Sequence, residues 1–190
     1  MSASNESCFA DLRHPTKLPR KMKFDEVALD RLMLINAALD GITMLDVEVR
    51  GCDLSAAVLS DGVFNRVRFS NCRKAGIDLS RAALHNVTFI GCRLDMANFR
   101  FAKLSSVTFE DCTLIEADFQ VGELSDVTLS DCTIERAMFD QCKVRNVDAR
   151  GSELRDVHGW RYLRGLTIDH AQLAAVAPEL ASDLGLKFNK

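Results

Sequence analysis

A five-residue pattern with an apolar residue at its centre runs through most of the chain. Leu54, Leu59 and Phe64 stand at such centres, and the spacing continues as far as Val144. A small or β-branched residue stands two positions before each centre. A helix repeats about every 3.6 residues and a strand about every two, so neither can keep every fifth side chain inside. The pattern therefore argues against both an ordinary helix and a hairpin sheet.

A second period of 20 residues explains the first. Valine recurs at this interval from Val27 to Val147. Cysteine does the same on a neighbouring track, at Cys52, Cys72, Cys92, Cys112 and Cys132. Four fives then make one turn, with two residues of each five facing inward and three facing outward. Equivalent residues of successive turns would stack about 4.7–4.9 Å apart, which is the spacing of paired strands. The sequence predicts a four-sided all-β solenoid.

Several of the five-residue units match a known repeat pattern. MANFR, EADFQ, GIDLS and RAMFD resemble the repeats of pentapeptide-repeat proteins. The resemblance covers roughly two thirds of the chain and implies a right-handed quadrilateral β-helix. Cysteine or valine often replaces the usual alanine at the small position, and Lys74 and Ala149 occupy central positions. These departures soften individual coils without changing the 20-residue register.

Three segments are expected: an N-terminal lead-in over residues 1–23, the repeat β-helix over 24–158, and a closing coil with a helical cap and dimerisation segment over 159–190. The lead-in contains CFADL at residues 8–12, which looks like one isolated repeat. Either this repeat covers the first coil or it belongs to a disordered tail. Some cover is needed, because an open solenoid end exposes unpaired backbone groups.

The C-terminal segment predicts helix once the repeat has failed. Thr167 or Asp169 is the expected N-cap, Pro178 starts a second short piece, and Gly185 is the stop. Apolar residues of this segment are expected to cover the last coil, to bind its copy in a second chain, or both: Leu173, Val176, Leu180, Leu184 and Leu186.

The inward tracks predict a continuous core. Free cysteine behaves as a small buried apolar residue, and five cysteines on one track form a ladder rather than the converging cluster that a metal needs. Two phenylalanine stacks are expected, one through Phe69, Phe89 and Phe109, and one through Phe99, Phe119 and Phe139.

Lys74 conflicts with this core, because an ammonium group is costly to bury without a partner. We expect either that its side chain escapes to solvent through a local distortion, or that its stem lines the core while its head reaches the edge. Replacement of Lys74 by leucine is then expected to stabilise the protein.

The outward positions carry two blocks of opposite charge. Basic residues dominate from Arg66 to Lys103, and acidic residues dominate from Glu110 to Asp140. The acidic belt is the predicted partner-binding surface, formed by Glu110, Asp111, Glu116, Asp118, Glu123, Asp126, Asp131 and Asp140. It spans more than one coil, so its charges face several sides. A surface that serves only solubility is the alternative.

The sequence gives no sign of catalysis. The four histidines fall in separate segments, and none shares a track with a cysteine or with a close pair of carboxylates. Acid–base and nucleophilic catalysis need at least two such groups within hydrogen-bond reach. The glycines fall singly, so no phosphate-cradling loop is predicted. We expect a binding protein without catalytic residue, metal or cofactor.

The resemblance supplies the leading functional hypothesis. A chain of this size with an uninterrupted rod and a helical cap is similar to the quinolone-resistance and toxin-immunity members of the family. The resemblance implies a homodimeric rod that imitates duplex DNA, engages DNA gyrase or topoisomerase IV, and confers resistance to drugs or toxins directed at these enzymes. No direct contact with nucleic acid is expected. The leading contacts would be Glu116, Asp118, Glu123, Asp126 and Asp140.

Two features oppose DNA mimicry. The formal net charge is only -3, and the basic middle coils would repel a basic DNA-binding surface. The alternative is a generic protein–protein interaction scaffold whose partner is unrelated to nucleic acid. In both cases we expect a cytoplasmic protein without membrane contact. The apolar stretches are too short to span a bilayer, and the first residues lack the layout of a signal peptide.

Overall fold

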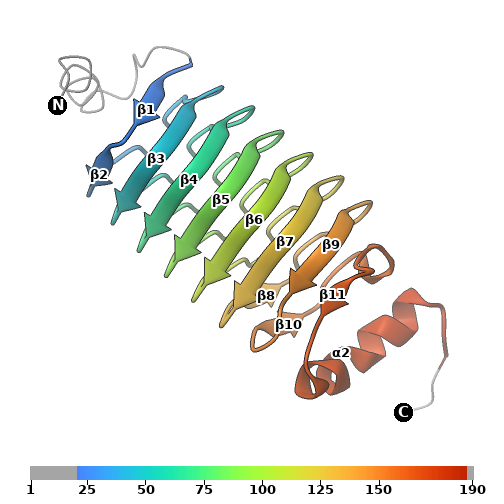
Figure 1. The fold of residues 1–190 in the computed structure, drawn as a ribbon. Coiled ribbons are helices and arrows are strands. Elements are labelled where there is room, and N and C mark those ends of the chain that lie inside the picture. Colours follow the sequence, from blue (N-terminus) through green and yellow to red (C-terminus); the bar gives the residue numbers. More distant parts are fainter. Residues whose placement is uncertain (1–20, 188–190) are drawn as a thin grey trace.

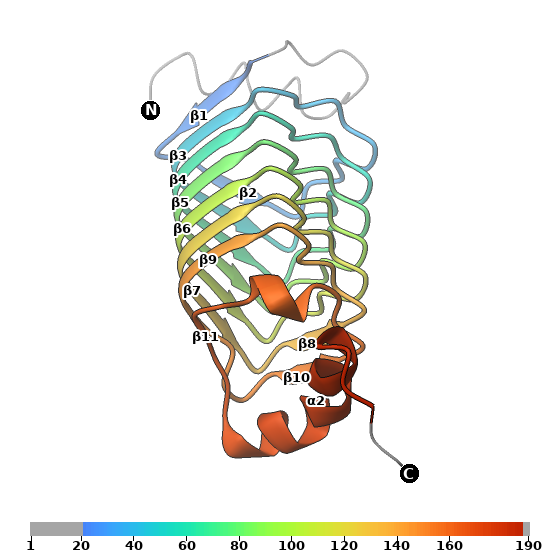
Figure 2. The same ribbon diagram turned by 90° about the vertical axis from the view of Figure 1, so that its right-hand side faces the viewer.

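The computed structural model describes residues 21–187, which form a parallel β-solenoid that ends in one helix (Figure 1, Figure 2). Strands of successive coils lie side by side along the rod, in the order β1-β3-β4-β5-β6-β7-β9-β11, with β2 also paired to β3. A short second sheet pairs β10 with β8. The predicted fold class is confirmed. The isolated repeat predicted at residues 8–12 lies outside the described residues.

The elements have the following bounds. The strands are β1 (Lys23–Asp25), β2 (Ala28–Asp30), β3 (Thr43–Arg50), β4 (Val63–Ser70), β5 (Ala83–Ile90), β6 (Lys103–Glu110), β7 (Glu123–Ser130), β8 (Thr133–Glu135), β9 (Lys143–Asp148), β10 (Glu153–Arg155) and β11 (Leu166–Thr167). The helical elements are the 3-10 helix η2 (Trp160–Tyr162) and the α-helix α2 (His170–Asp183).

The coils stack in the 20-residue register that the sequence predicts. Between β4 and β5, Val67 pairs with Val87 in parallel, and all neighbouring long strands pair in the same way. Each strand from β3 to β7 is eight residues long and covers two sides of its coil. The other two sides are held by isolated bridges, such as Asp78 to Asn98. Each side therefore presents columns of equivalent residues along the rod.

Each corner of the coil is turned by a residue with a left-handed backbone. Every fifth residue from Glu26 to Asp156 has a φ between +50° and +79°. Such angles are uncommon for residues other than glycine, asparagine and aspartate, and many corners carry one of these three. Val121 and Phe101, both with φ of 60°, are exceptions. The sequence reasoning missed this rule, although the corner residues recur at a fixed interval.

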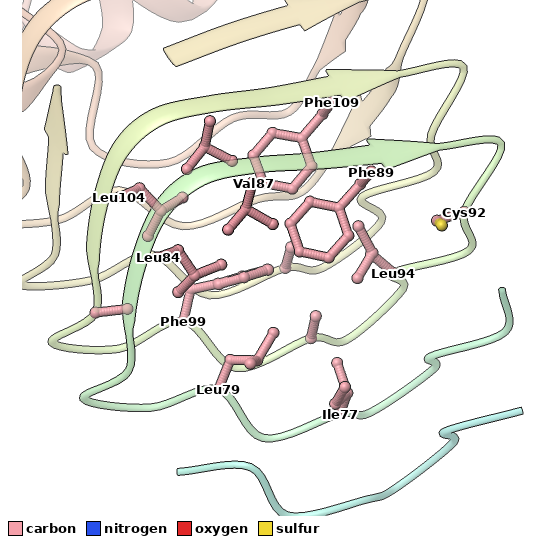
Figure 3. Packing of buried hydrophobic residues seen from close by; sticks show 14 of the residues in the cluster. Ile77, Leu79, Leu84, Val87, Phe89, Cys92, Leu94, Phe99, Leu104 and Phe109 are labelled. Atoms are coloured by element: carbon pink, nitrogen blue, oxygen red, sulfur yellow. The ribbon is translucent and has the colours of Figure 1, made fainter. Parts of the chain in front are cut away.

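Two phenylalanine stacks lie in the lumen among other apolar side chains, and Figure 3 shows Phe89 and Phe109 of the first stack with Phe99 of the second. The ring centroids of Phe69 and Phe89 lie 5.0 Å apart, and those of Phe89 and Phe109 lie 4.9 Å apart, with nearly parallel planes. The second stack consists of Phe99, Phe119 and Phe139. The two stacks meet edge to face, with the Phe99 ring at 89° to the Phe109 ring. Both predicted stacks are confirmed.

The five cysteines of one track are buried and free, as predicted. Each thiol lies beside backbone carbonyl oxygens that accept from it. Cys112, for example, donates to the carbonyls of Glu110 at 3.3 Å and Phe89 at 3.5 Å. Cys142, on another side of the coil, is also buried and free. The thiols therefore serve as small core residues with local backbone partners.

Lys74 is fully buried, with 0% exposure, so both expectations for its side chain were wrong. Its ammonium nitrogen lies 3.6 Å from the centroid of the Phe69 ring and donates to the Cys92 sulfur at 3.7 Å. The backbone keeps its regular pairing here, since the Lys74 N–H donates to the Arg93 carbonyl at 2.8 Å. The flexible stem fits the inward column without distorting the coil. Burial then lowers the pKa of Lys74.

Helix α2 is one continuous helix, so the prediction of a second piece starting at Pro178 was wrong. Of the two predicted N-caps, Asp169 holds the position: its carboxylate accepts from the Gln172 N–H at 2.9 Å, and the Gln172 side chain accepts from the Asp169 N–H at 2.7 Å. The helix stops before Gly185, as predicted, where φ is 73°. An internal proline tends to break a helix. Here Gln172 before Pro178 and Glu179 after it both bond to the last coil, and these contacts support the helix on both sides of the proline.

The last coil is closed by polar side chains of α2. The Gln172 amide donates to the carbonyls of Ala149 and Ser152, both at 2.6 Å. The Glu179 carboxylate accepts from the Asp156 N–H at 2.9 Å and the Val157 N–H at 3.2 Å. These bonds satisfy backbone groups that have no further coil to pair with. No helix within residues 21–187 is long and apolar enough to cross a membrane.

Candidate interaction surface

The eight carboxylates of the predicted acidic belt do not share one face. Glu110 ends β6, whereas Asp118 lies two fives further along, on the opposite side of the four-sided coil. Glu123 begins β7 on a third side. The belt therefore encircles the rod, and a single flat partner can contact only part of it.

Five of the eight carboxylates are engaged by residues of neighbouring coils. Asp118 pairs with Arg100 at 3.1 Å, and Glu123 pairs with Lys143 at 2.9 Å. The others of this set are Glu116 with Arg136, Asp126 with Arg145 and Asn146, and Asp140 with Gln120. These are the five residues that the sequence favours as leading contacts. Four of them have a cation of the rod beside them, and Asp140 accepts from the neutral Gln120 amide, which weakens all five as partner contacts.

The 20-residue register creates these pairs and also neutralises part of the basic block. Arg66 pairs with Asp46 at 2.5 Å, and Arg81 pairs with Asp61 at 2.8 Å. The hydrogen bond from each arginine lowers the pKa of the aspartate it contacts. The hydrogen bond from Lys143 does the same for Glu123. Sequence reasoning missed these pairs because it counted charge along the chain rather than along the columns.

Several exposed charged residues form no ion pair within residues 21–187, among them Lys103 and Arg164, and five of them lie along one edge of the rod. We call this the mixed-charge edge; it consists of Arg68, Arg73, Glu110, Asp111 and Asp131. The edge runs along one corner of the four-sided rod. One side of this corner holds the C-terminal halves of the long strands, and the other side holds the residues that follow these strands in the chain. The cations lie in the coil of β4, and the carboxylates lie in the coils of β6 and β7.

Part of this edge has a structural origin as well. Asp111 and Asp131 are corner residues with φ of 50° and 53°, where aspartate is better tolerated than most residues. Arg68, Arg73 and Glu110 have no such backbone reason. Their side chains are outward, exposed and unpaired by other described residues. These three are therefore the clearest candidates for contacts outside the chain.

An open cleft beside the cap brings one histidine and several carboxylates together within the described residues. This cleft of about 550 Å³ lies between the closing coil and α2, lined by residues that include His158 and Glu179. The Glu179 carboxylate is occupied by hydrogen bonds to the backbone and to the Trp160 indole. Within residues 21–187, no three His, Cys, Asp or Glu side chains are grouped so that they could hold a metal ion.

The residues predicted for dimerisation divide into two groups. Val176 is fully buried and Leu180 packs against the same core, so both belong to the cap of their own chain. Leu173 and Leu184 are 47% and 71% exposed. Leu186, just after the helix, is also exposed. The exposed leucines remain as the apolar surface that α2 offers to a second chain.

A family model described as "Pentapeptide repeat region" matches residues 63–139, which confirms the resemblance seen in the repeats. No curated protein matches the chain. The matched region contains both phenylalanine stacks and all five residues of the mixed-charge edge. It covers the regular centre of the rod and leaves the closing coil and α2 outside.

Several solved structures are similar to this chain. Full-length QnrB1, described as a plasmid-mediated fluoroquinolone resistance protein, is 20% identical, with 83% of this chain and 99% of that chain covered and a TM-score of 0.32. HetL from the cyanobacterium Nostoc, described as involved in heterocyst differentiation regulation, is 14% identical, with 83% and 92% covered and a TM-score of 0.37. Rfr23 from the cyanobacterium Cyanothece is 15% identical, with 87% and 96% covered and a TM-score of 0.33. At these values the roles of those proteins do not transfer to this chain.

Proposed function

Because the chain carries a pentapeptide-repeat region over residues 63–139, we propose that it is a non-enzymatic binding protein that presents one edge of a rod to a protein partner. The observation behind this proposal is the mixed-charge edge, whose five exposed charges are unpaired within the described residues, whereas many charges on the other sides are paired across coils. Rigid presentation favours binding, because side chains held in place lose less entropy when a partner is bound.

The backbone supplies that rigidity. Outward residues next to inward centres are fixed by parallel pairing with the coil before and the coil after, as Thr108 is with Thr88 and Thr128. The stacked rings beneath them fill the lumen. A partner therefore meets a lattice of side chains at intervals of about 4.7–4.9 Å along the rod.

For the partner, we propose a type II topoisomerase, either DNA gyrase or topoisomerase IV. A basic surface built for duplex DNA would attract the carboxylates of Glu110, Asp111 and Asp131, which have no cation beside them in the described chain. Contact there would compete with DNA and would give resistance to drugs or toxins that act on the enzyme. The five paired carboxylates have a secondary role in this proposal.

The low net charge of this chain limits any imitation of DNA to the mixed-charge edge. Duplex DNA carries about one negative charge per 1.7 Å of its axis, whereas this chain has a formal net charge of -3. Most of its outward charges are paired within the rod. The whole rod is thus a poor electrostatic copy of DNA, and the proposed contact is local.

A supercoiling assay with purified DNA gyrase, with and without a fluoroquinolone, tests the proposal. The wild-type chain is expected to inhibit supercoiling or to protect it from the drug. The combined variant Glu110→Gln, Asp111→Asn and Asp131→Asn should lose the effect. The control is Glu123→Gln, which removes a paired carboxylate and should retain the effect. If the wild type has no effect at any concentration, a scaffold whose partner is unrelated to DNA becomes the better proposal.

The homodimer through α2 also remains a proposal, now carried by the exposed leucines. Leu184→Ser should lower the mass of the particle in solution, because it removes the most exposed apolar side chain of the cap. Val176→Ser should instead destabilise the monomer, because Val176 is buried against the last coil. An unchanged mass for Leu184→Ser, measured by light scattering, would argue against this dimer.

A further inference from the structure

We propose that two copies of this chain associate side by side and antiparallel through one corner of the rod. We call it the apolar corner; it consists of Phe101 and Val121 with Lys103 and Glu123 beside them. It lies half a coil away from Asp111 and therefore on the corner opposite the mixed-charge edge. The proposal rests neither on the topoisomerase contact nor on the dimer through α2, because it uses residues of neither.

The two apolar residues stand where the backbone disfavours them. Phe101 and Val121 each have a φ of 60°, and among the described residues they are the only aromatic and the only β-branched residue with a positive φ. This conformation is least favourable for such side chains. Phe101 is 49% exposed, so it adds little to its own core, and the Arg100 guanidinium 5.7 Å from its ring centroid is a weak, exposed contact. An apolar contact with a second molecule would offset the backbone cost.

The apolar corner carries the same pattern in two successive coils. Phe101 and Val121 are 20 residues apart and follow each other along the rod. Beside them, Lys103 stands opposite Glu123 in the parallel register of β6 and β7. Lys103 is exposed and forms no ion pair within residues 21–187, whereas Glu123 pairs with Lys143 at 2.9 Å. Each coil therefore presents an apolar residue with a charge beside it, positive in the first coil and negative in the second.

This pattern is complementary to its own reverse. A two-fold axis across the corner, at right angles to the rod and between these two coils, reverses the second rod and keeps each position around the coil. Phe101 of one copy then faces Val121 of the other, Lys103 faces Glu123, and symmetry repeats both contacts. With the axis on either coil instead, Lys103 or Glu123 would face its own copy. The charges therefore select the axis between the coils.

The positions around the apolar corner are compatible with this axis. It brings three further pairs opposite each other, one residue from each copy: Arg81 and Gln141, Ala83 and Lys143, and Arg100 and Gln120. None of these pairs sets like charges against each other. Within its own chain, Arg81 is paired with Asp61 at 2.8 Å, as Lys143 is with Glu123. The surrounding cations therefore have counter-charges at hand.

A contact confined to one corner buries little surface, and interfaces below about 1,000 Å² are weak. The dimer should therefore form only as the protein concentration rises. Sedimentation velocity of the full chain at low salt, where exposed charges are least screened, measures it. All proteins carry Leu184→Ser, so that association through α2 does not contribute. The parent with this one change should show a dimer fraction that rises with concentration.

Phe101→Asn separates the contact from folding. Asparagine tolerates left-handed backbone better than most residues, so the variant should melt at the same temperature as the parent or higher. Its dimer should nevertheless be lost, because the apolar centre is gone. Met96→Asn is the matched control, since Met96 is 58% exposed with a φ of 57° but lies on another corner. That variant should keep the dimer.

Charge exchange tests the facing of the two copies. Lys103→Glu and Glu123→Lys should each be monomeric where the parent is dimeric, because each sets like charges opposite each other twice. In an equimolar mixture, the introduced glutamate at 103 faces the introduced lysine at 123, and the native Glu123 of the first chain faces the native Lys103 of the second. The mixture should therefore recover the dimer that neither variant forms alone.

Four outcomes overturn the proposal. The first is a parent that stays monomeric at every concentration. The second is a dimer that persists in Phe101→Asn. The third is a mixture of the two charge variants that stays monomeric. The fourth is loss of the dimer in Met96→Asn, which would place the contact on a different corner of the rod.

Discussion

The ammonium nitrogen of Lys74 lies 3.6 Å from the centroid of the Phe69 ring, at a position with no exposed surface. A second ring, Phe89, lies 4.6 Å away, and the Cys92 sulfur accepts a hydrogen bond. Cation–π attraction contributes about 2 kcal/mol when the cation is desolvated. Removing an ion from water costs several kcal/mol even after relaxation. The balance is unfavourable for the charged form, and burial accordingly lowers the pKa of Lys74.

Lys74→Leu should therefore raise the free energy of unfolding at pH 7, by about 1–4 kcal/mol. Leucine already occupies the same column at Leu54 and Leu94, so the new side chain has a matching site. Urea titration measures the change. Lys103→Leu, at an exposed position, should alter stability by less than about 0.5 kcal/mol. A less stable Lys74→Leu protein would mean that the buried amine makes a specific favourable contact.

The advantage of Lys74→Leu should also depend on pH. The folded pKa is lowered from 10.5, so between the two pKa values the unfolded chain binds one more proton than the folded chain. The stability of the wild type then rises with pH through that window, and its penalty vanishes above the unfolded pKa. The difference between variant and wild type should shrink as pH is raised from 7 towards 10.5. A difference that is constant with pH would show that Lys74 does not titrate differently on folding.

Val121→Asn should stabilise the protein by about 1 kcal/mol, because left-handed backbone is costly for most residues and least so for glycine and asparagine. Val121 has a φ of 60° and is β-branched. The reverse change at another corner, Asn86→Val, where φ is 53°, should destabilise by a similar amount. Thermal unfolding of both variants measures the pair. Equal melting temperatures would indicate that the corners relax without strain.

Phe109→Ala should cost about 3–5 kcal/mol, because it opens a cavity in the lumen. The Phe109 ring stacks on Phe89 at 4.9 Å and meets the edge of Phe99 at 6.1 Å. Phe101→Ala is the matched control, since Phe101 is an outward residue that is 49% exposed. Chemical denaturation should show a large loss for the first and a small change for the second. Similar losses for both would contradict the assignment of inward and outward positions.

The interior was predictable from the sequence because residues that are 20 positions apart in an exact repeat lie next to each other in successive coils. Phe89 and Phe109 stand 20 residues apart and stack as the period requires. The surface was not, because the pairing of Arg136 with Glu116 depends on which cation stands above which carboxylate in a column. Reading the charges in columns of 20 would have found that pair. The burial of Lys74 escaped prediction for a different reason: a long flexible stem can follow the lumen, and no sequence rule gives its direction.

Glu179 joins the cap to the rod, and its removal should separate the two. Its carboxylate accepts from the Val157 N–H at 3.2 Å and from the Trp160 indole N–H at 3.0 Å, both on buried residues. Glu179→Ala leaves these donors without partners, and each unsatisfied buried group costs about 1–3 kcal/mol. Alanine favours helix at least as well as glutamate, so the loss should not come from α2 itself.

The single tryptophan reports on this joint directly. In Glu179→Ala, the emission of Trp160 should shift to longer wavelength, because the indole gains contact with water when the cap loosens. Glu179→Gln keeps an acceptor oxygen and should show a smaller shift and a smaller loss of stability. The far-ultraviolet signal of the strands should persist at temperatures where the Trp160 signal has already changed, since the stacked coils do not depend on Glu179. Simultaneous loss of both signals would show instead that the cap and the rod unfold as one unit.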